Sequence, residues 1–364
     1  MRRPSLPDFP WDALVPYHRR AGEYPGGAVD LSIGTPVDPT PAVVQQAMLS
    51  ATDAPGYPAT AGTPALREAA STWLERRFGL TGIDPDAILP TIGSKELVVW
   101  LPTLLGAGPG DVVVYPELAY PSYDVGARLA GAEPVAADGV TALGPRRVSL
   151  IWVNSPANPH GQVLPTEHLA KVVAWARERG TVVASDECYL EFGWESAPVS
   201  VLDPTVNGGS TEGVLAVHSL SKRSNLAGYR AGFVAGDPAL VADLLQVRKH
   251  AGMMVPAPVQ AAMVAALNDD EHVDAQRQRY ARRRDLLRPA LERAGFRIEH
   301  SQGGLYLWGT RDEPCWQTMA WLAERGIVVA PGDFYGAAGA AHVRIAMTAT
   351  DEHVVEAASR LDAG

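Results

Sequence analysis

Hydrophobic residues in the middle of the chain fall into short, nearly continuous runs that are bounded by Gly, Pro or Asp. The runs cover residues 112–115, 148–153, 181–184, 214–217 and 231–234. Short apolar runs of this kind are typical of strands that are buried on both faces of a parallel sheet. We therefore expect each run to form a strand of one central sheet.

The segments between these runs have the periodicity of amphipathic helices. Thr63 and Pro64 predict an N-cap and a first helical residue, and the helix then presents one apolar stripe, formed by Leu66, Ala69, Ala70, Trp73 and Leu74. Thr166 is expected to cap a second helix that ends at Gly180 and buries Leu169, Val172, Val173 and Ala176. Strands that alternate with helices indicate an open α/β sheet with right-handed crossovers.

The pattern changes after Val255 and Pro256. A long, charged helix is expected over residues 277–293, with an apolar side formed by Tyr280, Leu286, Leu287, Ala290 and Leu291. Short strands are expected at residues 304–308, 327–330 and 342–347. We predict a large α/β domain over residues 35–250 and a smaller α+β domain that combines residues 251–364 with the proline-rich residues 1–34.

The composition limits the classes of protein to which the chain can belong. Of its 364 residues, 46% are hydrophobic and 20% are charged, and 31 Lys and Arg against 41 Asp and Glu give a net charge of −10. These values are typical of a globular protein with a sizeable core. The acidic balance argues against binding along a nucleic-acid backbone. The basic residues 277–288 lie at helical spacing between apolar positions, which favours a solvated helix face.

No targeting or membrane-spanning segment is expected. Prolines and aspartates follow Met1 where a signal peptide would have an apolar run, and the longest apolar stretch, residues 97–108, is broken by Pro102. Cys188 and Cys315 are too few for a disulfide scaffold or a cysteine zinc site, and the nine histidines have no metal-ligand spacing. We expect a cytoplasmic protein without a metal site or a membrane partner.

Polar side chains follow three successive strands of the predicted sheet. The strands that end at residues 153, 184 and 217 are followed by Asn158, Asp186 and Lys222. Ligands of open α/β sheets bind at the carboxyl ends of the strands, so we expect these side chains to meet. Each has an ordinary alternative when taken alone: a turn residue, a helix N-cap or a solvated lysine.

Together, the amide, the carboxylate and the amine suit pyridoxal 5'-phosphate. Lys222 would form a Schiff base with the aldehyde of this cofactor and act as general base at the substrate's Cα. Asp186 would keep the pyridine nitrogen protonated. Asn158 and Tyr189 would hydrogen-bond the phenolic oxygen of the ring, although Tyr189 alone could equally be a core tyrosine.

From about Leu31 to its end, the chain resembles the class I/II aminotransferases of fold-type I. The most specific match is Ser219-Leu220-Ser221-Lys222 with Arg230 eight residues after the lysine. Residues 154–161 resemble the family's Asn-Pro-x-Asn-Pro-Thr-Gly turn, with His160 in place of threonine. The resemblance implies a large domain with a mainly parallel sheet sandwiched by helices, a smaller α+β domain, and bound pyridoxal phosphate.

The same resemblance implies roles for further residues. Ser219 and Arg230 would hold the cofactor phosphate together with the turn Gly93-Ser94-Lys95, which precedes a helix and so offers backbone N–H donors to a dianion. Tyr120 would stack on the pyridine ring, with a core tyrosine as the alternative. Tyr57 would reach the phosphate in the neighbouring subunit, which implies a homodimer.

Arg344 is the candidate for the substrate's α-carboxylate. It lies between apolar residues on a predicted strand, and its planar guanidinium suits a bidentate grip on a carboxylate; a structural salt bridge is the alternative. Gly34 resembles the glycine whose backbone approaches the same carboxylate. A dicarboxylate substrate needs a second cation. Arg248 is our hypothesis, with Lys249, Arg19 and Arg20 as other candidates, and simple solvated charge is the alternative for each.

Residues 6–11, 34–39, 221–230 and 248–252 are similar to the bacterial succinyldiaminopimelate aminotransferases. This similarity implies a reversible, ping-pong transfer of an amino group from glutamate, which leaves 2-oxoglutarate, to N-succinyl-2-amino-6-oxopimelate on the route to lysine and diaminopimelate. The alternatives are an aminotransferase for aspartate, another acidic amino acid or a natural-product intermediate, and a C–S lyase on the same fold. A regulator that senses the cofactor is a further alternative, but we expect no room for its DNA-binding module before the pocket.

Overall fold

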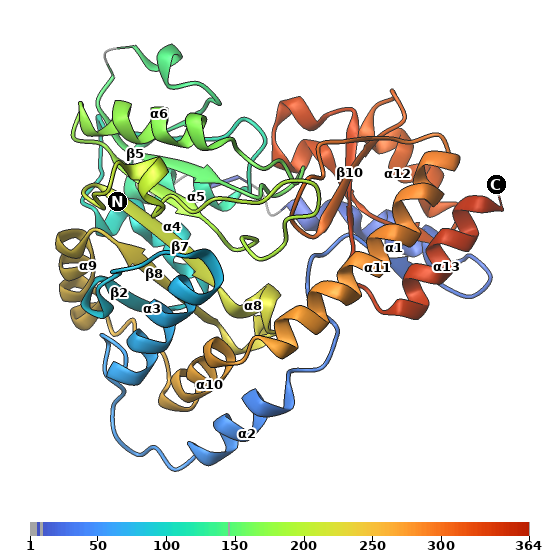
Figure 1. Cartoon of the computed structure of the whole chain (residues 1–364). Coiled ribbons are helices and arrows are strands. Elements are labelled where there is room, and N and C mark those ends of the chain that lie inside the picture. The colour runs from blue at the N-terminus through green and yellow to red at the C-terminus, as the bar shows by residue number, and fades with distance from the viewer. Residues whose placement is uncertain (1–5, 8–9, 145, 364) are drawn as a thin grey trace.

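The computed structural model describes residues 6–7, 10–144 and 146–363, and its centre is a seven-stranded sheet in the order β2-β8-β7-β6-β5-β3-β4 (Figure 1). The strands are Ile88–Ile92 (β2), Val112–Tyr115 (β3), Glu133–Ala136 (β4), Val148–Asn154 (β5), Val182–Asp186 (β6), Val214–Ser219 (β7) and Ala231–Gly236 (β8). Neighbours from β4 to β7 are parallel, whereas β8 is antiparallel to β7 and to β2. The predicted strands and the mainly parallel sheet are confirmed.

Two strands of this sheet, β2 and β4, are not predicted by the hydrophobic pattern. β2 contains Pro90, which argues against a central strand. The structure resolves the conflict because β2 lies at the edge of the sheet. β4 forms the other edge, and its residues are partly or fully exposed, so they do not form a continuous apolar run.

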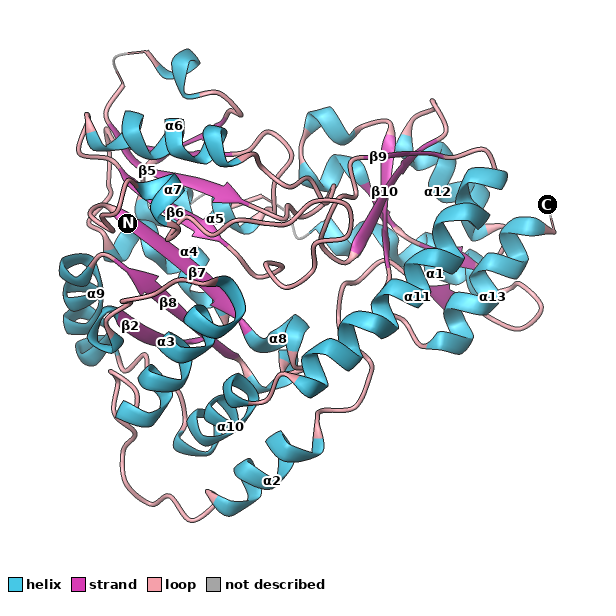
Figure 2. Cartoon of the chain, in the orientation of Figure 1, coloured by secondary structure: helices cyan, strands magenta, loops and turns pink. Residues whose placement is uncertain are grey.

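Helices cover both faces of the sheet (Figure 2). One core cluster joins Ala216 and its neighbours to α3 (Pro64–Phe78), α6 (Thr166–Arg177) and α10 (Ala257–Asn268). The other joins Leu215 and Val217 to α4 (Ser94–Leu104), α5 (Ser122–Ala130) and α9 (Pro238–Ala251). Alternate residues of β7 therefore face opposite helical layers, as the strand geometry requires. Short helices α2, α7 and α8 cover Ala42–Ser50, Pro204–Asn207 and Leu220–Arg223.

The two predicted helix starts have different outcomes. Thr63 caps α3 as expected, because its side chain accepts a hydrogen bond from the Leu66 N–H. The prediction for Thr166 is wrong: Pro165 holds the N-cap position of α6, and no side chain caps this end. The helix also ends at Arg177, before Gly180.

A second, smaller sheet follows the order β12-β13-β10-β9 and is antiparallel. Its strands are Arg297–Glu299 (β9), Tyr306–Thr310 (β10), Ala330–Pro331 (β12) and His342–Ala346 (β13), while Val29–Asp30 (β1) pairs with Ile327–Val328 (β11). The one strand expected over residues 327–330 is thus two strands in different sheets. Helices α1 (Val15–Gly22), α11 (Glu271–Arg293), α12 (Cys315–Ala323) and α13 (Asp351–Asp362) complete this part.

The smaller part has its own hydrophobic core. Leu14, Ala21, Val29 and Leu31 from the start of the chain join the same cluster as Leu287 and Leu291 of α11. Leu286, which we expected on the apolar side of this helix, is 47% exposed. The predicted division puts residues 251–364 in the smaller domain, yet α10 packs in the core of the large sheet. The division itself stays a prediction.

Helix α11 begins at Glu271, earlier than expected, and runs from beside α8 to α13 (Figure 1). It therefore connects the helix that follows β7 with the smaller part. In the part of the chain that the structure describes, the helices are too short or too polar to cross a membrane.

Candidate active site

A cavity of about 700 Å³ lies at the carboxyl ends of β6 and β7, and residues of β10 and β13 complete its wall. Most of the residues predicted from the sequence line this cavity: Gly34, Ser94, Lys95, Tyr120, Asn158, Asp186, Tyr189, Ser219, Lys222, Arg230 and Arg344. The structure therefore brings together side chains that are dispersed over most of the sequence.

Lys222 lies in α8, which begins directly after β7. Ser219 caps this short helix, because its Oγ accepts a hydrogen bond from the Ser221 N–H at 3.1 Å. The Lys222 Nζ donates to the carbonyl oxygen of Gly34. Burial lowers the pKa of Lys222. More of its amine is therefore neutral, which is the form that condenses with an aldehyde and accepts a proton.

Asp186 is the last residue of β6 and is buried. Its Oδ2 accepts a hydrogen bond from the Tyr123 hydroxyl at 2.8 Å, and its Oδ1 accepts one from the Cys188 N–H at 3.2 Å. Burial raises the pKa of Asp186, and these hydrogen bonds oppose the rise. No described helix begins directly after Asp186, so it is not a helix N-cap. A buried carboxyl group without a cationic partner among the described residues fits a protonated ring nitrogen.

Hydrogen-bond donors that suit a phosphate group lie next to Lys222 and Asp186. Helix α4 begins at Ser94, so the first N–H groups of the helix are directed to the cavity. Gly93 has a φ of +71°, and a Cβ at this position would overlap the Arg230 guanidinium. Glycine thus lets Arg230 approach the start of α4. The Arg230 Nη1 also donates to the Ala227 carbonyl oxygen at 2.7 Å.

Arg344 lies on β13 with its side chain buried in the cavity wall. Its Nη1 donates to the Asn158 Oδ1 at 2.9 Å and its Nη2 to the Ser32 carbonyl oxygen at 2.6 Å. The guanidinium carbon lies 4.1 Å from the centroid of the Tyr306 ring and 4.9 Å from that of Tyr335. Among the described residues it has no carboxylate partner.

Three tyrosines of the site are absent from the sequence-based predictions. Tyr123 supports Asp186, and Tyr335 lies against Arg344. The Tyr306 hydroxyl lies 2.9 Å from that of Tyr189, and its ring occupies the space that a Cβ at Gly34 would need. No local motif marks these tyrosines. Tyr306 reaches the site because β10 pairs with β13, and this pairing is known only from the fold.

Three of the predicted site residues, Gly93, Arg248 and Tyr57, do not line the cavity. Arg248 is fully buried, and its Nη1 and Nη2 donate to the two carboxylate oxygens of Glu96 at 2.8 and 3.0 Å. The hypothesis that Arg248 binds a second substrate carboxylate is therefore corrected, since its guanidinium already has a carboxylate partner outside the cavity. Tyr57 lies on the surface, 98% exposed. His160 is buried behind the wall, with its Nε2 3.0 Å from the Gln162 Oε1.

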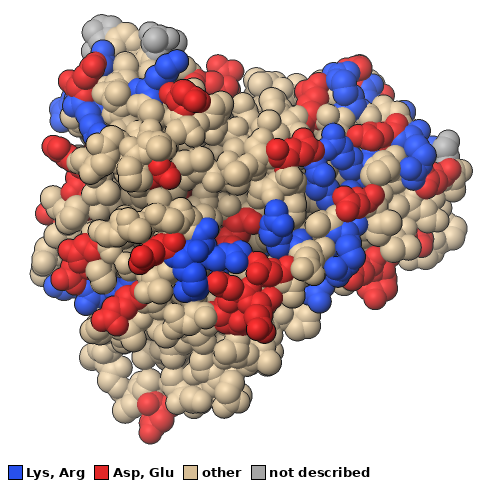
Figure 3. Space-filling view, in the orientation of Figure 1, with Lys and Arg blue, Asp and Glu red and all other residues tan. Residues whose placement is uncertain are grey.

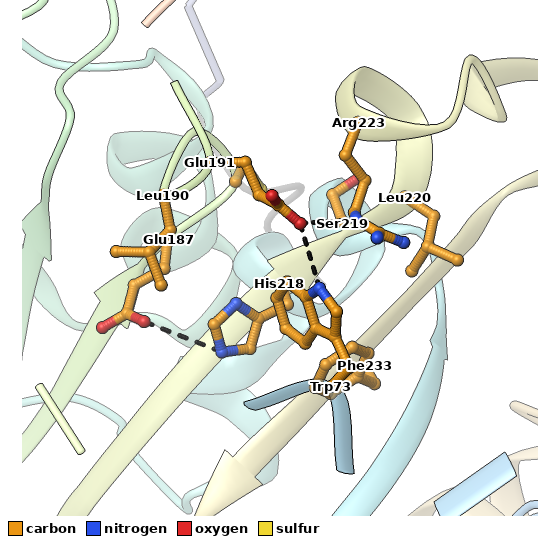
Figure 4. Close-up of a pocket in the computed structure, with 10 residues that line it drawn as sticks. Trp73, Glu187, Leu190, Glu191, His218, Ser219, Leu220, Arg223 and Phe233 are labelled. Carbon is orange, nitrogen blue, oxygen red and sulfur yellow. Dashed lines mark hydrogen bonds and ion pairs between the residues drawn. The ribbon is translucent and has the colours of Figure 1, made fainter. Parts of the chain in front are cut away.

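A second, water-sized cavity of about 10 Å³ is lined by Ser219, Glu191 and Arg223, among other residues (Figure 4). Glu191 accepts hydrogen bonds there from the Trp73 Nε1 at 2.9 Å and from the Arg223 Nε at 3.0 Å. Arg223 directly follows Lys222 in α8. This network fixes the short helix against α3 and thereby limits where the lysine amine can lie.

The residues of the large cavity fit pyridoxal phosphate. They supply an amine with a lowered pKa, a buried carboxyl group that no cation from the described part of the chain pairs with, and phosphate donors at a helix N-terminus. An α/β sheet that carries this set at its carboxyl edge defines a pyridoxal-phosphate enzyme.

The chain belongs to the aminotransferase class I and II family, whose model matches residues 27–361. Members of this family use pyridoxal phosphate. The chain is 62% identical to OxyQ of Streptomyces rimosus, a 4-dedimethylamino-4-oxo-anhydrotetracycline transaminase, over 98% of this chain and 99% of the relative. It is 35% identical to the LL-diaminopimelate aminotransferase of Gloeobacter violaceus, over 97% and 96%. A probable N-succinyldiaminopimelate aminotransferase from Thermus thermophilus superposes with a TM-score of 0.87 at 31% identity, over 97% and 99%.

Proposed function

We propose that this aminotransferase moves the amino group of glutamate to N-succinyl-2-amino-6-oxopimelate. The observation that carries the proposal is Arg344, a buried guanidinium that lines the cavity of Lys222 and has no carboxylate partner among the described residues. Such a group fits the α-carboxylate of an amino acid. The similarity to the Thermus thermophilus protein supports the succinylated acceptor. The similarity to LL-diaminopimelate aminotransferases supports only a substrate of the diaminopimelate type.

We assign residues of the site separate roles in the reaction. When bound, pyridoxal phosphate supplies an aldehyde that takes up the amino group and a ring that withdraws electrons. We assign to Lys222 the transfer of the proton from the substrate's Cα, and to Asp186 the protonated state of the ring nitrogen. Arg344 and Asn158 would orient the α-carboxylate. Asn158 and Tyr189 would hydrogen-bond the phenolic oxygen of the cofactor, and Tyr120 would lie against its ring. Gly93, Ser94, Ser219 and Arg230 would hold its phosphate.

The distal carboxylates of glutamate and of the acceptor need a cation other than Arg344. The cations among the described residues of the cavity wall are Lys95, Lys222, Arg230 and Arg344. Lys222 and Arg230 are assigned to the cofactor. We propose that Lys95, which the family resemblance assigns to the cofactor phosphate, binds a distal carboxylate instead. Its Nζ lies 5.8 Å from the centroid of the Tyr120 ring, at the side of the cavity formed by α4.

The proposal is tested by half-reactions of the holoenzyme. Glutamate should convert the cofactor to its aminated form and release 2-oxoglutarate, and N-succinyl-2-amino-6-oxopimelate should reverse the change in cofactor absorbance. Arg344→Lys keeps the charge but loses the bidentate grip, so the KM for glutamate should rise roughly tenfold to a hundredfold. Arg248→Lys is the matched control and should leave this KM unchanged.

Other results would contradict the proposal. Release of pyruvate and ammonia from a sulfur-containing amino acid would indicate a C–S lyase. Binding of the cofactor without turnover of any amino donor would favour a sensing role. A glutamate half-reaction that is reversed by oxaloacetate but not by the succinylated keto acid would indicate an aminotransferase for aspartate.

One observation favours a second acceptor. OxyQ, a 4-dedimethylamino-4-oxo-anhydrotetracycline transaminase, is 62% identical to this chain along nearly its whole length. Apolar side chains of the cavity wall, among them Trp11, Ile33, Val99 and Val125, would suit a large carbon-rich ketone. Reversal of the glutamate half-reaction by such a polycyclic ketone, and not by the succinylated acid, would decide for this acceptor.

We also propose that the working unit is a homodimer. The exposed Tyr57 is the residue expected to reach the neighbouring phosphate. Val43 and Leu49 of α2 are exposed as well, and few charged side chains lie over α2 in the space-filling view (Figure 3). Exposed apolar side chains of this kind favour contact with a second copy of the chain over contact with solvent.

A further inference from the structure

Residues 31–40 form a segment, here called the strap, that contacts both functional groups of the proposed reaction. The Ser32 carbonyl oxygen accepts a hydrogen bond from the Arg344 Nη2 at 2.6 Å. Two residues later, the Gly34 carbonyl oxygen accepts one from the Lys222 Nζ. The position of this backbone therefore affects the distance between the Arg344 guanidinium and the Lys222 amine.

The strap is held at both ends by the elements that carry these groups. At its start, the Leu31 carbonyl oxygen accepts a hydrogen bond from the Ala346 N–H at 2.8 Å, on the strand of Arg344. At its end, the Asn225 Nδ2 donates to the Pro39 carbonyl oxygen at 3.2 Å. Asn225 lies three residues after Lys222, so the strap connects the Arg344 strand to the Lys222 loop.

A buried ion pair anchors the strap between these ends. The Asp38 carboxylate accepts hydrogen bonds from the Arg283 Nη1 at 2.9 Å and Nη2 at 2.7 Å, and from the Gln276 Nε2 at 2.8 Å. The Asp38 and Arg283 side chains are only 10% and 2% exposed. Gln276 also accepts from the Asn225 Nδ2 at 3.1 Å. Helix α11, which carries Gln276 and Arg283, thus holds both the strap and the loop after Lys222.

We propose that Asp38 and Arg283 are positioning residues of the active site, and that their pair sets where the strap holds Arg344 and Lys222 relative to each other. Neither residue lines the cavity. A bidentate arginine–carboxylate pair fixes orientation as well as distance, and small displacements of reacting groups reduce productive binding. The inference rests on the roles proposed for Lys222 and Arg344.

The structure offers a matched control on the same guanidinium. The Arg283 Nε donates to the Asp351 Oδ1 at 2.6 Å. Asp351 begins α13, is 57% exposed, and is not part of the strap. If Arg283 only stabilised the fold, loss of either carboxylate would lower the free energy of unfolding, and the decrease would be larger for the more buried pair. If it positions the strap, only loss of Asp38 should affect the site.

The experiment compares Asp38→Asn with Asp351→Asn in the holoenzyme. Asp38→Asn should raise the KM for glutamate roughly tenfold while kcat changes less than about threefold, because ground-state positioning of the substrate is lost. Amide hydrogen exchange of residues 31–40 should become roughly tenfold faster, because the segment opens more easily. Asp351→Asn should change neither quantity.

Three results would overturn the proposal: a wild-type KM in Asp38→Asn, unchanged exchange of residues 31–40, or equal effects of the two variants. If the wild type itself does not use glutamate, the proposed function fails while the exchange measurement still tests the strap. If Asp38→Asn does not fold, Arg283→Lys keeps a positive charge opposite Asp38 and removes the bidentate hydrogen bonds of the guanidinium. This variant should accelerate exchange in residues 31–40 and not in β6, and unchanged exchange would refute the proposal.

Discussion

At the scale of single residues, Asp186 and Arg344 are both ionisable, buried, and without a partner of opposite charge among the described residues. An isolated buried charge is costly, and proteins usually pair or neutralise it. Here hydrogen bonds from Tyr123 and Cys188 support the carboxyl group, and two tyrosine rings lie against the guanidinium. Because this support is incomplete, each group favours a ligand of opposite charge.

His160 gives a prediction of pH dependence at the same scale. Burial lowers the pKa of His160 to about 4, from about 6.5 for a histidine in water. The unfolded chain therefore binds a proton below pH 6.5 that the folded protein does not. Stability should fall as the pH drops from 6.5 towards 4, by up to about 3 kcal/mol from this group.

The measurement is urea unfolding at pH 7.5 and pH 4.5. His160→Gln should show a smaller loss of stability between the two pH values than the wild type, because the titrating group is gone. His353→Gln, at an exposed position of α13, should behave like the wild type. An equal loss in His160→Gln and wild type would show that His160 does not cause the acid sensitivity.

At the scale of elements, helix starts depend on whether a side chain meets a free N–H group. Thr63 and Thr166 have the same residue type and a similar place before an apolar stripe. Only Thr63 precedes its helix, while Thr166 is already inside α6 and Pro165 takes the preceding position. The sequence pattern locates both helices but does not distinguish these two positions.

This difference predicts unequal effects of the same substitution. Thr63→Ala removes the hydrogen bond at 3.2 Å to the Leu66 N–H and should lower the free energy of unfolding by about 1 kcal/mol. Thr166→Ala should change it by less than about 0.5 kcal/mol, since no cap is lost. Urea denaturation of both variants tests this, and equal shifts of the midpoint would contradict the assignment of the cap.

At the scale of the whole molecule, the active site lies where two separately packed parts meet. The large sheet supplies Asp186, helix α8 directly after β7 supplies Lys222, and the smaller sheet supplies Arg344. The strap and α11 run between these elements. Geometry at the site therefore depends on how the two parts are held together. In the proposed homodimer, the second subunit would add its Tyr57 to this site.

Tyr57→Phe tests that contribution. The substitution removes one hydroxyl that is proposed to bond the neighbouring phosphate, so affinity for pyridoxal phosphate should fall roughly tenfold. The fold of the single chain should be unaffected, because the side chain is almost fully exposed. Titration of the apoprotein with cofactor measures the change, and sedimentation of the same sample reports its assembly. Unchanged affinity in a dimeric sample would contradict the role.

The sequence by itself determined the buried strands, the capped start of α3 and the identity of the groups at the ends of β6 and β7. These features depend on residues that are close in the chain, where turn, cap and strand preferences act. Lys222 and Asp186 were identifiable for the same reason, because each closely follows the end of a predicted strand. Arg230 was identifiable only through the family resemblance, by its spacing from Lys222.

Only the tertiary structure decided that Arg248 is held by Glu96, that Tyr306 and Tyr335 surround Arg344, and that Asp38 binds Arg283. Each of these contacts joins residues far apart in the sequence or on different elements. Their formation depends on strand register and helix packing, which bring together side chains whose local sequences contain no information about one another.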